Sequence, residues 1–336
     1  MDQTVSRSDI KTPVIDGLNC ASLTREQFQR TLEGRVSTIN LTSLRPAHDL
    51  AQSMGDLGKA LSSVAANPDL VSIVTSVREI REIAAAGKLG IILGTQNSTF
   101  LEHDVSLIRV MQRIGVRIMQ PTYMEQNELG SGVLAKQQGG LTAKGHEWVD
   151  LMNESRILID LSHVGYQSSM DVLKASRRPV ICSHSNARAL CNSLRNIPDD
   201  QIKAVAETGG TVGVTPWPPM LRHAARPTLE DFYAQVDYMV NLVGIEHVAF
   251  GSDCSEATKT EEQWHATFGP RGMYPEVTGV LGDWFIFTQR FTEGYSSLAH
   301  TGRLIDGLAA RGYPADQVDK IMGGNLLRVY EQVWGE

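Results

Sequence analysis

Eight short segments of this chain are apolar over nearly their whole length, and most of them end on one or two polar residues. They occupy residues 12–19, 36–43, 89–97, 116–123, 156–163, 178–185, 210–217 and 247–254. Runs of this length without regular polar alternation are typical of strands buried on both faces, as in parallel sheets. This pattern constrains the fold more than any other feature of the sequence.

Between the apolar runs lie amphipathic segments with helical spacing, at residues 104–115, 142–155, 166–176, 198–210 and 229–244. Several begin at a Thr or Asp that can cap a helix, and several end at Gly. Buried strands that alternate with helices predict a parallel sheet covered by helices. An open doubly wound sheet is the alternative, but no Gly-x-Gly-x-x-Gly motif follows the first strand. We therefore predict an α/β fold, a (β/α)8 TIM-type barrel that forms a single domain over residues 1–336. The C-terminal helices are expected on its outside.

Three of the predicted strands end on residues that can bind a metal or transfer protons: His163, His184 and Asp253. The carboxyl ends of the strands of a parallel barrel meet at one mouth, so these side chains should converge. One strand-end histidine is more often structural, but two on neighbouring strands together with an aspartate favour a metal or catalytic site. Two neutral imidazoles and a carboxylate could hold a zinc-like ion and its water.

Residues 260–287 follow the last strand and are rich in Gly, Pro and aromatic residues. Their composition predicts a long loop over the barrel mouth, where such loops commonly shape a substrate pocket.

The composition points to a small-molecule substrate as the partner. The net charge is -7, and no block of Lys and Arg is interleaved with aromatic residues, so neither nucleic acid nor a membrane surface is expected. No run approaches the roughly 20 apolar residues of a membrane helix, and the first residues lack an apolar signal core. We expect a soluble, cytoplasmic protein. Its four cysteines show no Cys-x-x-Cys spacing, which argues against disulfides.

Several motifs resemble the renal (membrane) dipeptidases and their bacterial relatives, zinc-dependent members of the amidohydrolase superfamily. They are ILIDLSHV (157–164), PVICSHSNA (179–187), LRNIPDD (194–200), VAFGSDCS (248–255) and IMGGNLLRVYEQV (321–333), and the resemblance covers essentially the whole chain. The family implies a barrel with two zinc ions that share a bridging glutamate, and a homodimer. It implies that His163 and His184 bind one metal, that Asp253 handles the water, and that Arg195 holds the carboxylate of the substrate.

This chain departs from the family pattern on three other strands. Where the family reads Asp-Gly-His-Asn-Asp, the first strand reads Asp-Gly-Leu-Asn-Cys, with Leu18 and Cys20 at the two ligand positions. Gln96 replaces the bridging glutamate, and Tyr123 replaces a histidine that polarises the scissile carbonyl. Leucine cannot bind a metal, and an amide oxygen is a poorer ligand than a carboxylate. We therefore expect one zinc ion rather than two.

The expected ligands of this ion are His163, His184 and Asp253. Cys20 is either a further thiolate ligand or a packing residue. In the favoured mechanism Asp253 orients a metal-activated water that attacks an amide carbonyl, and Tyr123 donates a hydrogen bond to the oxyanion. Arg195 grips a substrate carboxylate with its planar guanidinium.

Gln96 and Asn97 have two readings of equal weight. They contact the substrate, or they satisfy backbone groups at the end of the strand.

The sequence thus predicts a dipeptidase-like, metal-dependent hydrolase. Its substrate would be a small carboxylate-bearing amide, such as a dipeptide or an N-acyl amino acid. Two alternatives remain open. One is a barrel enzyme without a metal, such as a lyase, isomerase or hydrolase that uses the same His, Asp and Tyr residues as acids and bases. The other is an inactive homologue that binds a small molecule.

Overall fold

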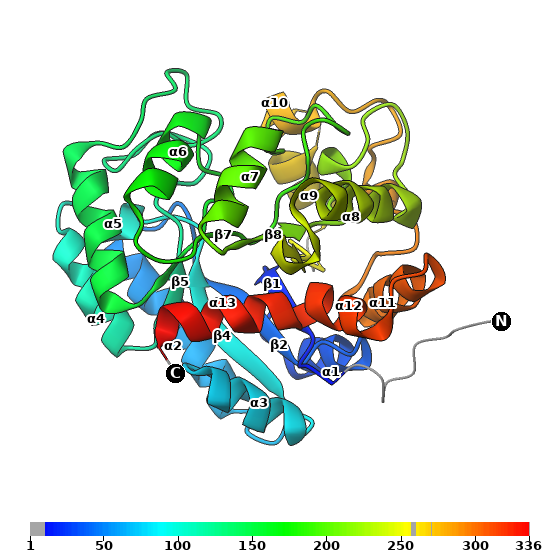
Figure 1. Ribbon diagram of the computed structural model, residues 1–336, viewed down its shortest axis with the longest axis horizontal. Helices are drawn as coiled ribbons and strands as arrows, with labels where there is room; N and C mark the ends of the chain where they lie inside the picture. Colours follow the sequence, from blue (N-terminus) through cyan, green and yellow to red (C-terminus); the bar gives the residue numbers. More distant parts are fainter. Residues whose placement is uncertain (1–10, 257–259, 270, 336) are drawn as a thin grey trace.

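The computed structural model describes residues 11–256, 260–269 and 271–335, and strands alternate with helices along this part of the chain (Figure 1). Each of the eight predicted strand segments contains a strand. The strands are β1 (Ile15–Asn19), β2 (Thr38–Leu44), β3 (Val71–Ile73), β4 (Leu89–Thr95), β5 (Val116–Met119), β6 (Leu158–Ile159), β7 (Ile181–Cys182), β8 (Thr211–Val214) and β9 (Val248–Phe250). Only β3 is absent from the prediction, because three residues carry too little periodicity to be recognised.

The strands pair in parallel throughout. One sheet has the order β1-β2-β4-β5-β6, with β3 beside the first half of β4, and a second sheet has the order β7-β8-β9. Two isolated parallel bridges connect the sheets, Asp160 with Ile181 and Asn19 with Cys254. The predicted α/β class with a curled parallel sheet is therefore confirmed.

The helices cover the sheets, and several of them begin at a residue whose side chain caps the helix. They are α1 (Arg25–Glu33), α2 (Leu50–Ala65), α3 (Val77–Ala85), α4 (Ile108–Arg113), α5 (Ala143–Ser155), α6 (Tyr166–Ala175), α7 (Asp199–Glu207), α8 (Leu229–Val243), α9 (Glu261–Phe268), α10 (Pro275–Thr278), α11 (Thr301–Ala310), α12 (Ala315–Asp319) and α13 (Asn325–Trp334). Thr142, for example, accepts a hydrogen bond from the Gly145 N–H at the start of α5 (3.0 Å). This side-chain acceptor satisfies one of the amides that a helix start leaves unpaired. None of the helices in the described ranges is both long and apolar enough to cross a membrane.

The helix α13 occupies a place that the sequence did not predict. Its apolar residues pack against the first or central residues of β1, β4, β6 and β7 in one buried cluster. Asn325, at its start, donates hydrogen bonds to the carbonyls of Ile245 and Val248 beside the start of β9 (2.7 and 2.8 Å). The expectation that the C-terminal helices lie on the outside is therefore wrong for α13, which crosses the amino ends of the strands (Figure 1).

The segment 260–287 is more ordered than its composition suggests, because it contains α9 and α10. Thr260 and Gln263 cap α9 reciprocally: the Thr260 hydroxyl accepts from the Gln263 N–H, and Gln263 Oε1 accepts from the Thr260 N–H. Thr-x-x-Gln is a known capping-box signal, and it precedes too short an amphipathic run to have predicted a helix. Residues 257–259 and 270 lie outside the described residues.

Candidate active site

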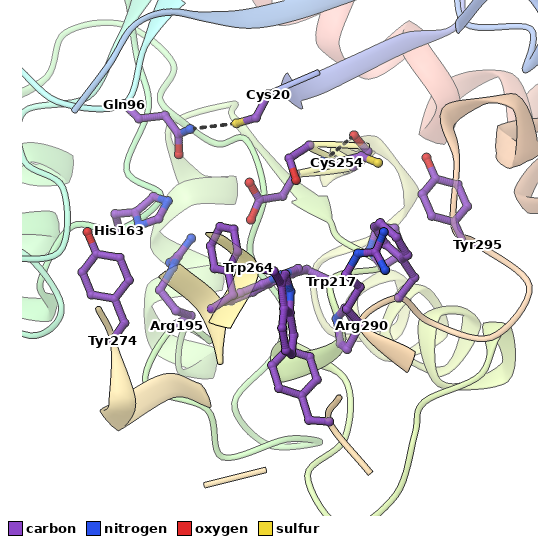
Figure 2. Close-up of a pocket in the computed structure, with 18 of the residues that line it drawn as sticks. Cys20, Gln96, His163, Arg195, Trp217, Cys254, Trp264, Tyr274, Arg290 and Tyr295 are labelled. Atoms are coloured by element: carbon purple, nitrogen blue, oxygen red, sulfur yellow. Dashed lines mark hydrogen bonds between the residues drawn. The ribbon is translucent and has the colours of Figure 1, made fainter. Parts of the chain in front are cut away.

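A cavity of about 110 Å³ lies at the carboxyl ends of the strands (Figure 2). Its polar wall comes from residues that follow β1, β4, β5, β6 and β9, together with Arg195. These polar residues are Cys20, Gln96, Tyr123, His163, Arg195 and Asp253. The rest of the lining is largely aromatic and includes Trp217, Trp264, Phe268, Tyr274, Phe285, Phe291 and Tyr295, with the Tyr274 ring 6.1 Å from that of Tyr123. The structure thus brings most of the predicted site residues to one mouth, and residues of the 260–287 segment line it.

The two predicted histidines meet at this mouth. His163 Nε2 lies 2.9 Å from His184 Nε2, and both side chains are buried. Burial, and then the positive charge of Arg195, hold the pKa of both imidazoles well below the usual value. Both rings are therefore neutral at neutral pH, which is the form that binds metals.

A buried aspartate fixes the tautomer of His184. Ser183 Oγ donates to Asp160 Oδ2 (2.5 Å), and Ser183 Oγ lies 2.8 Å from His184 Nδ1. Because the serine proton is directed to Asp160, His184 Nδ1 must carry the proton that it shares with the serine. His184 Nε2 then presents a lone pair toward His163. Metal-binding histidines are commonly held in this way, with the other ring N–H donated to a neighbouring group. Sequence analysis missed Asp160 and Ser183, although both stand inside the strand-end motifs of the two histidines.

The first strand carries an aspartate in an equivalent place. Asp16 Oδ1 accepts from the backbone N–H groups of Ser252 (2.6 Å) and Leu18 (3.3 Å), and Oδ2 accepts from Ser252 Oγ (2.6 Å) and Asn19 Nδ2 (2.8 Å). Burial raises the pKa of Asp16 to about 6, against the opposing effect of these hydrogen bonds. Asp16 therefore ties β1 to the end of β9 and does not face the cavity.

The residues at the ends of β1 and β4 bind one another. Gln96 Nε2 donates to Thr42 Oγ1 (2.8 Å) and to Cys20 Sγ (3.2 Å), while Gln96 Oε1 is buried without a hydrogen-bond partner. Burial, with the nearby charge of Asp253, raises the pKa of Cys20 to about 12, so the thiol stays protonated at neutral pH. Leu18 is part of the core. This side of the mouth therefore presents neutral groups.

The donor set does not fit a centre with two metals. Across residues 11–256, 260–269 and 271–335, no three His, Cys, Asp or Glu side chains converge closely enough to hold an ion. The structure supplies two imidazoles, one fewer than the three protein ligands that catalytic zinc commonly has. Cys20 and Asp253 line the same cavity as His163, but neither forms a group of three ligands with the two histidines. The thiol is held by Gln96 and Thr42, and the N–H of Asp253 bonds to the Leu18 carbonyl on the β1 side.

Asp253 and Tyr123 keep properties that suit catalysis. Burial raises the pKa of Asp253 to about 7, and the charge of Arg195 partly opposes this rise. The Tyr123 ring lies 4.1 Å from the His163 ring, and burial raises the pKa of its phenol well above 10, so Tyr123 remains a donor. His163 and Asp253 have φ angles of 70° and 49°, a left-handed conformation that is uncommon for residues other than glycine. Such backbone strain concentrates at functional sites.

Arg195 is buried yet incompletely bonded. Its side chain is 2% exposed, it lines the cavity, and its Nε and Nη2 atoms have no hydrogen-bond partner. Buried polar groups are nearly always paired, so these two donors need an explanation.

Asn97, in contrast, does not line the cavity. Its Nδ2 donates to the Pro46 carbonyl, and its Oδ1 accepts from Ser98 N–H and Asn127 Nδ2. For Asn97 the structure supports the structural reading over substrate contact.

Comparison with known proteins agrees with this geometry. A sequence model of the membrane dipeptidase family (peptidase family M19) matches residues 12–267. The chain is 32% identical over 230 residues to an uncharacterized protein from the pqqA 5' region of Klebsiella pneumoniae, covering 66% of this chain and 73% of that protein. It is 28% identical to dipeptidase aclJ of Aspergillus oryzae over 79% of its own length, and it spans 57% of that fungal protein.

Solved structures show the same fold. An amidohydrolase from Pseudomonas aeruginosa superposes with a TM-score of 0.88 at 31% identity, over 98% of both chains. A metallo peptidase from Rhodobacter sphaeroides, bound to a phosphinate mimic of L-Ala-D-Ala, superposes with a TM-score of 0.78 at 19% identity, over 96% of this chain and 99% of that one. The family model spans most of the chain, and the strand-end residues that it covers form the cavity described above. The chain therefore belongs to the membrane dipeptidase family of metallopeptidases.

Proposed function

We propose that this protein hydrolyses an amide bond in a small carboxylate-bearing substrate, such as a dipeptide or an N-acyl amino acid. The observation that carries the proposal is Arg195, a buried cation with two unpaired donors at a cavity that also contains His163 and Asp253. Burying an unpaired charge is costly, so a ligand that supplies the missing acceptors explains its position. The planar guanidinium can bind a carboxylate through two parallel hydrogen bonds.

His163 and His184 are the residues that would hold a single zinc-class ion. Their neutral state and the hydrogen bond between Ser183 and His184 Nδ1 support this role. When bound, such an ion would acidify a water molecule and polarise the substrate carbonyl.

The remaining steps belong to the protein's own side chains. Asp253, with a pKa near neutrality, would accept a proton from the attacking water and return it to the departing amine nitrogen. Tyr123 would donate a hydrogen bond to the oxygen that becomes negatively charged. Arg195 would hold the carboxylate and so position the amide between these groups.

We also propose that the two sheets form one closed (β/α)8 barrel. The bridges Asp160–Ile181 and Asn19–Cys254 support this, since each joins the edge strands of the two sheets.

The test compares a dipeptide with its C-terminal amide. We expect wild-type protein to lose about 10²-fold in kcat/KM when the carboxylate is amidated, and Arg195→Met to erase most of this difference. Arg109→Met is the control, because that side chain is exposed and is not part of the cavity lining. Undiminished hydrolysis of the dipeptide by Arg195→Met would reject the proposal.

A metal-independent hydrolase is the second candidate, and the observation that favours it is the donor count of two imidazoles. Full activity after exhaustive chelation, with no metal detected in the protein, would select this candidate.

A further inference from the structure

A second arginine, Arg290, lines the cavity on the side opposite Arg195 (Figure 2). Its guanidinium carbon lies 3.9 Å from the centre of the Phe287 ring and 4.7 Å from that of Phe291, and Nη1 donates to the Phe287 carbonyl (2.5 Å). These contacts hold the guanidinium in place. Its Nε atom is nevertheless buried without a hydrogen-bond partner.

The two arginines give the cavity an excess of positive charge. Among the described residues that line the cavity, Arg195 and Arg290 are the cations, and Asp253, with a pKa of about 7, is only partly ionised near neutral pH. No carboxylate in the described part of the chain forms an ion pair with either arginine. A dipeptide with uncharged side chains is a zwitterion, so it brings one carboxylate and adds an ammonium group. A substrate with two anionic groups complements the cavity better.

The wall between the two cations is apolar. It includes Trp217, Trp264 and Phe268, with the Trp217 and Phe268 rings edge to face at 6.5 Å. Binding sites of this kind use apolar walls to enclose the body of a ligand and a few polar groups to fix its ends. The part of the substrate that spans the cavity should therefore be apolar.

We infer that the substrate is an amide with a carboxylate at each end, one held by Arg195 on the amine side and one held by Arg290 on the acyl side. An amino acid acylated by a dicarboxylic acid has this chemistry. The inference rests on the proposed function for the amide that is cleaved and for the role of Arg195, and it adds Arg290 as a specificity-determining residue. Two planar guanidinium groups select against a substrate that lacks either carboxylate, because the unmatched arginine would keep buried nitrogen donors without an acceptor, Nε and Nη2 of Arg195 or Nε of Arg290.

The experiment compares N-glutaryl-alanine with N-(4-carbamoylbutanoyl)-alanine. The two compounds share the same scissile amide and the same leaving alanine, and they differ only in a terminal carboxylate or primary amide on the acyl chain. We expect wild-type protein to prefer the glutaryl compound by about tenfold or more in kcat/KM. Arg290→Gln should lower kcat/KM for the glutaryl compound far more than for the carbamoyl compound.

Two further variants complete the test. Arg271→Gln changes an exposed arginine that also follows β9 but lies outside the cavity lining, so it should keep the wild-type preference. Arg290→Lys keeps the charge without the planar fork, so it should retain part of the preference, and it replaces Arg290→Gln if that variant does not fold.

The outcomes separate this inference from the proposed function. Hydrolysis of both compounds at equal rates by wild-type protein would overturn the inference and leave the proposed function intact. If neither compound is hydrolysed, the thermal unfolding midpoint is measured with each one. Greater stabilisation by the glutaryl compound that Arg290→Gln abolishes would sustain the inference, and equal or no stabilisation would overturn it.

Discussion

The cavity mouth has two halves. Similar hydrogen bonds hold the strand ends in both halves, but the side chains at those ends differ in chemistry. The histidine half, His163 and His184, presents two neutral imidazoles that face each other. The first-strand half, Cys20 and Gln96, presents a protonated thiol and an amide bonded to each other. Only the histidine half offers donors that bind a zinc-class ion well.

The supports behind the two halves share one hydrogen-bond pattern. Asp160 and Asp16 each accept from a backbone N–H two residues later, and each accepts from both the N–H and the hydroxyl of a serine on a neighbouring strand end. An amide side chain fills the remaining position in both cases, Gln120 for Asp160 and Asn19 for Asp16. The same hydrogen-bond pattern is therefore present at the first strand, where the side chains at the mouth are not metal ligands. The pattern supports the fold whether or not the site binds a metal.

The largest expected effect comes from the histidine half. His163→Ala removes one of the two facing nitrogens, so we expect metal content to fall from about one zinc-class ion per chain to none and turnover to be abolished. Metal analysis of purified protein and an amide-hydrolysis assay measure both. Cys20→Ala, the matched change in the first-strand half, should retain the ion. Two firmly bound ions in wild-type protein, or full activity of His163→Ala, would contradict the comparison.

The two buried aspartates offer a matched pair of variants. Asp160→Asn removes the acceptor that directs the Ser183 proton, so His184 loses its fixed tautomer, and metal affinity should fall by about 10- to 100-fold. Asp16→Asn disturbs an equivalent hydrogen-bond pattern but should change metal affinity little. Chelator competition gives both values. Equal losses of metal affinity in the two variants would contradict this expectation, because Asp16 would then matter to the metal site as much as Asp160.

Asp253 links the mouth to pH-dependent stability. Its folded pKa, about 7, lies above the unfolded value of about 3.8, so the folded state binds the extra proton. The stability contributed by this group is full below pH 4 and is lost as the pH rises through 7. In metal-stripped protein Asp253→Asn should therefore gain stability over wild type by on the order of 1 kcal/mol or more at pH 8, and much less at pH 5. Urea unfolding at both pH values tests the sign, and a larger gain at pH 5 would refute it.

The last prediction concerns the chemical reactivity of Cys20 in the first-strand half. Because its thiol pKa is near 12, alkylation by iodoacetamide at pH 8 should be about 10²-fold or more slower than for a free thiol. Peptide mapping after timed alkylation of folded protein measures this rate. Rapid modification of Cys20 would mean that the first-strand half carries a reactive thiolate after all.

Much of the fold could be predicted from the sequence because apolar strands and their polar ends are local signals. The proximity of His163 and His184 followed from their places at the ends of neighbouring strands, and the structure confirms it. The place of α13 could not be predicted in this way, since an amphipathic helix packs equally well on the outside of a sheet or across its strand ends.

Cavity residues could be predicted from the sequence where they follow the end of a strand. They could not be predicted where an irregular segment carries them to the cavity. Arg290 belongs to an irregular segment, so no periodicity indicated that its side chain would reach the cavity. Asp253 follows the end of β9 and lines the cavity, as its place in the sequence predicted, but its left-handed φ of 49° could not be predicted from the sequence.

The position of α13 has a consequence for synthesis of the protein. Leu326, Tyr330 and Val333 share one buried cluster with Ile15, so residues of the first strand and of α13, far apart in the sequence, complete the same core. Because α13 is synthesised after all the strands, the apolar surface that it covers at the amino ends of the strands stays exposed in the nascent chain until then. Chaperones that shield apolar surface should therefore engage this protein until α13 docks.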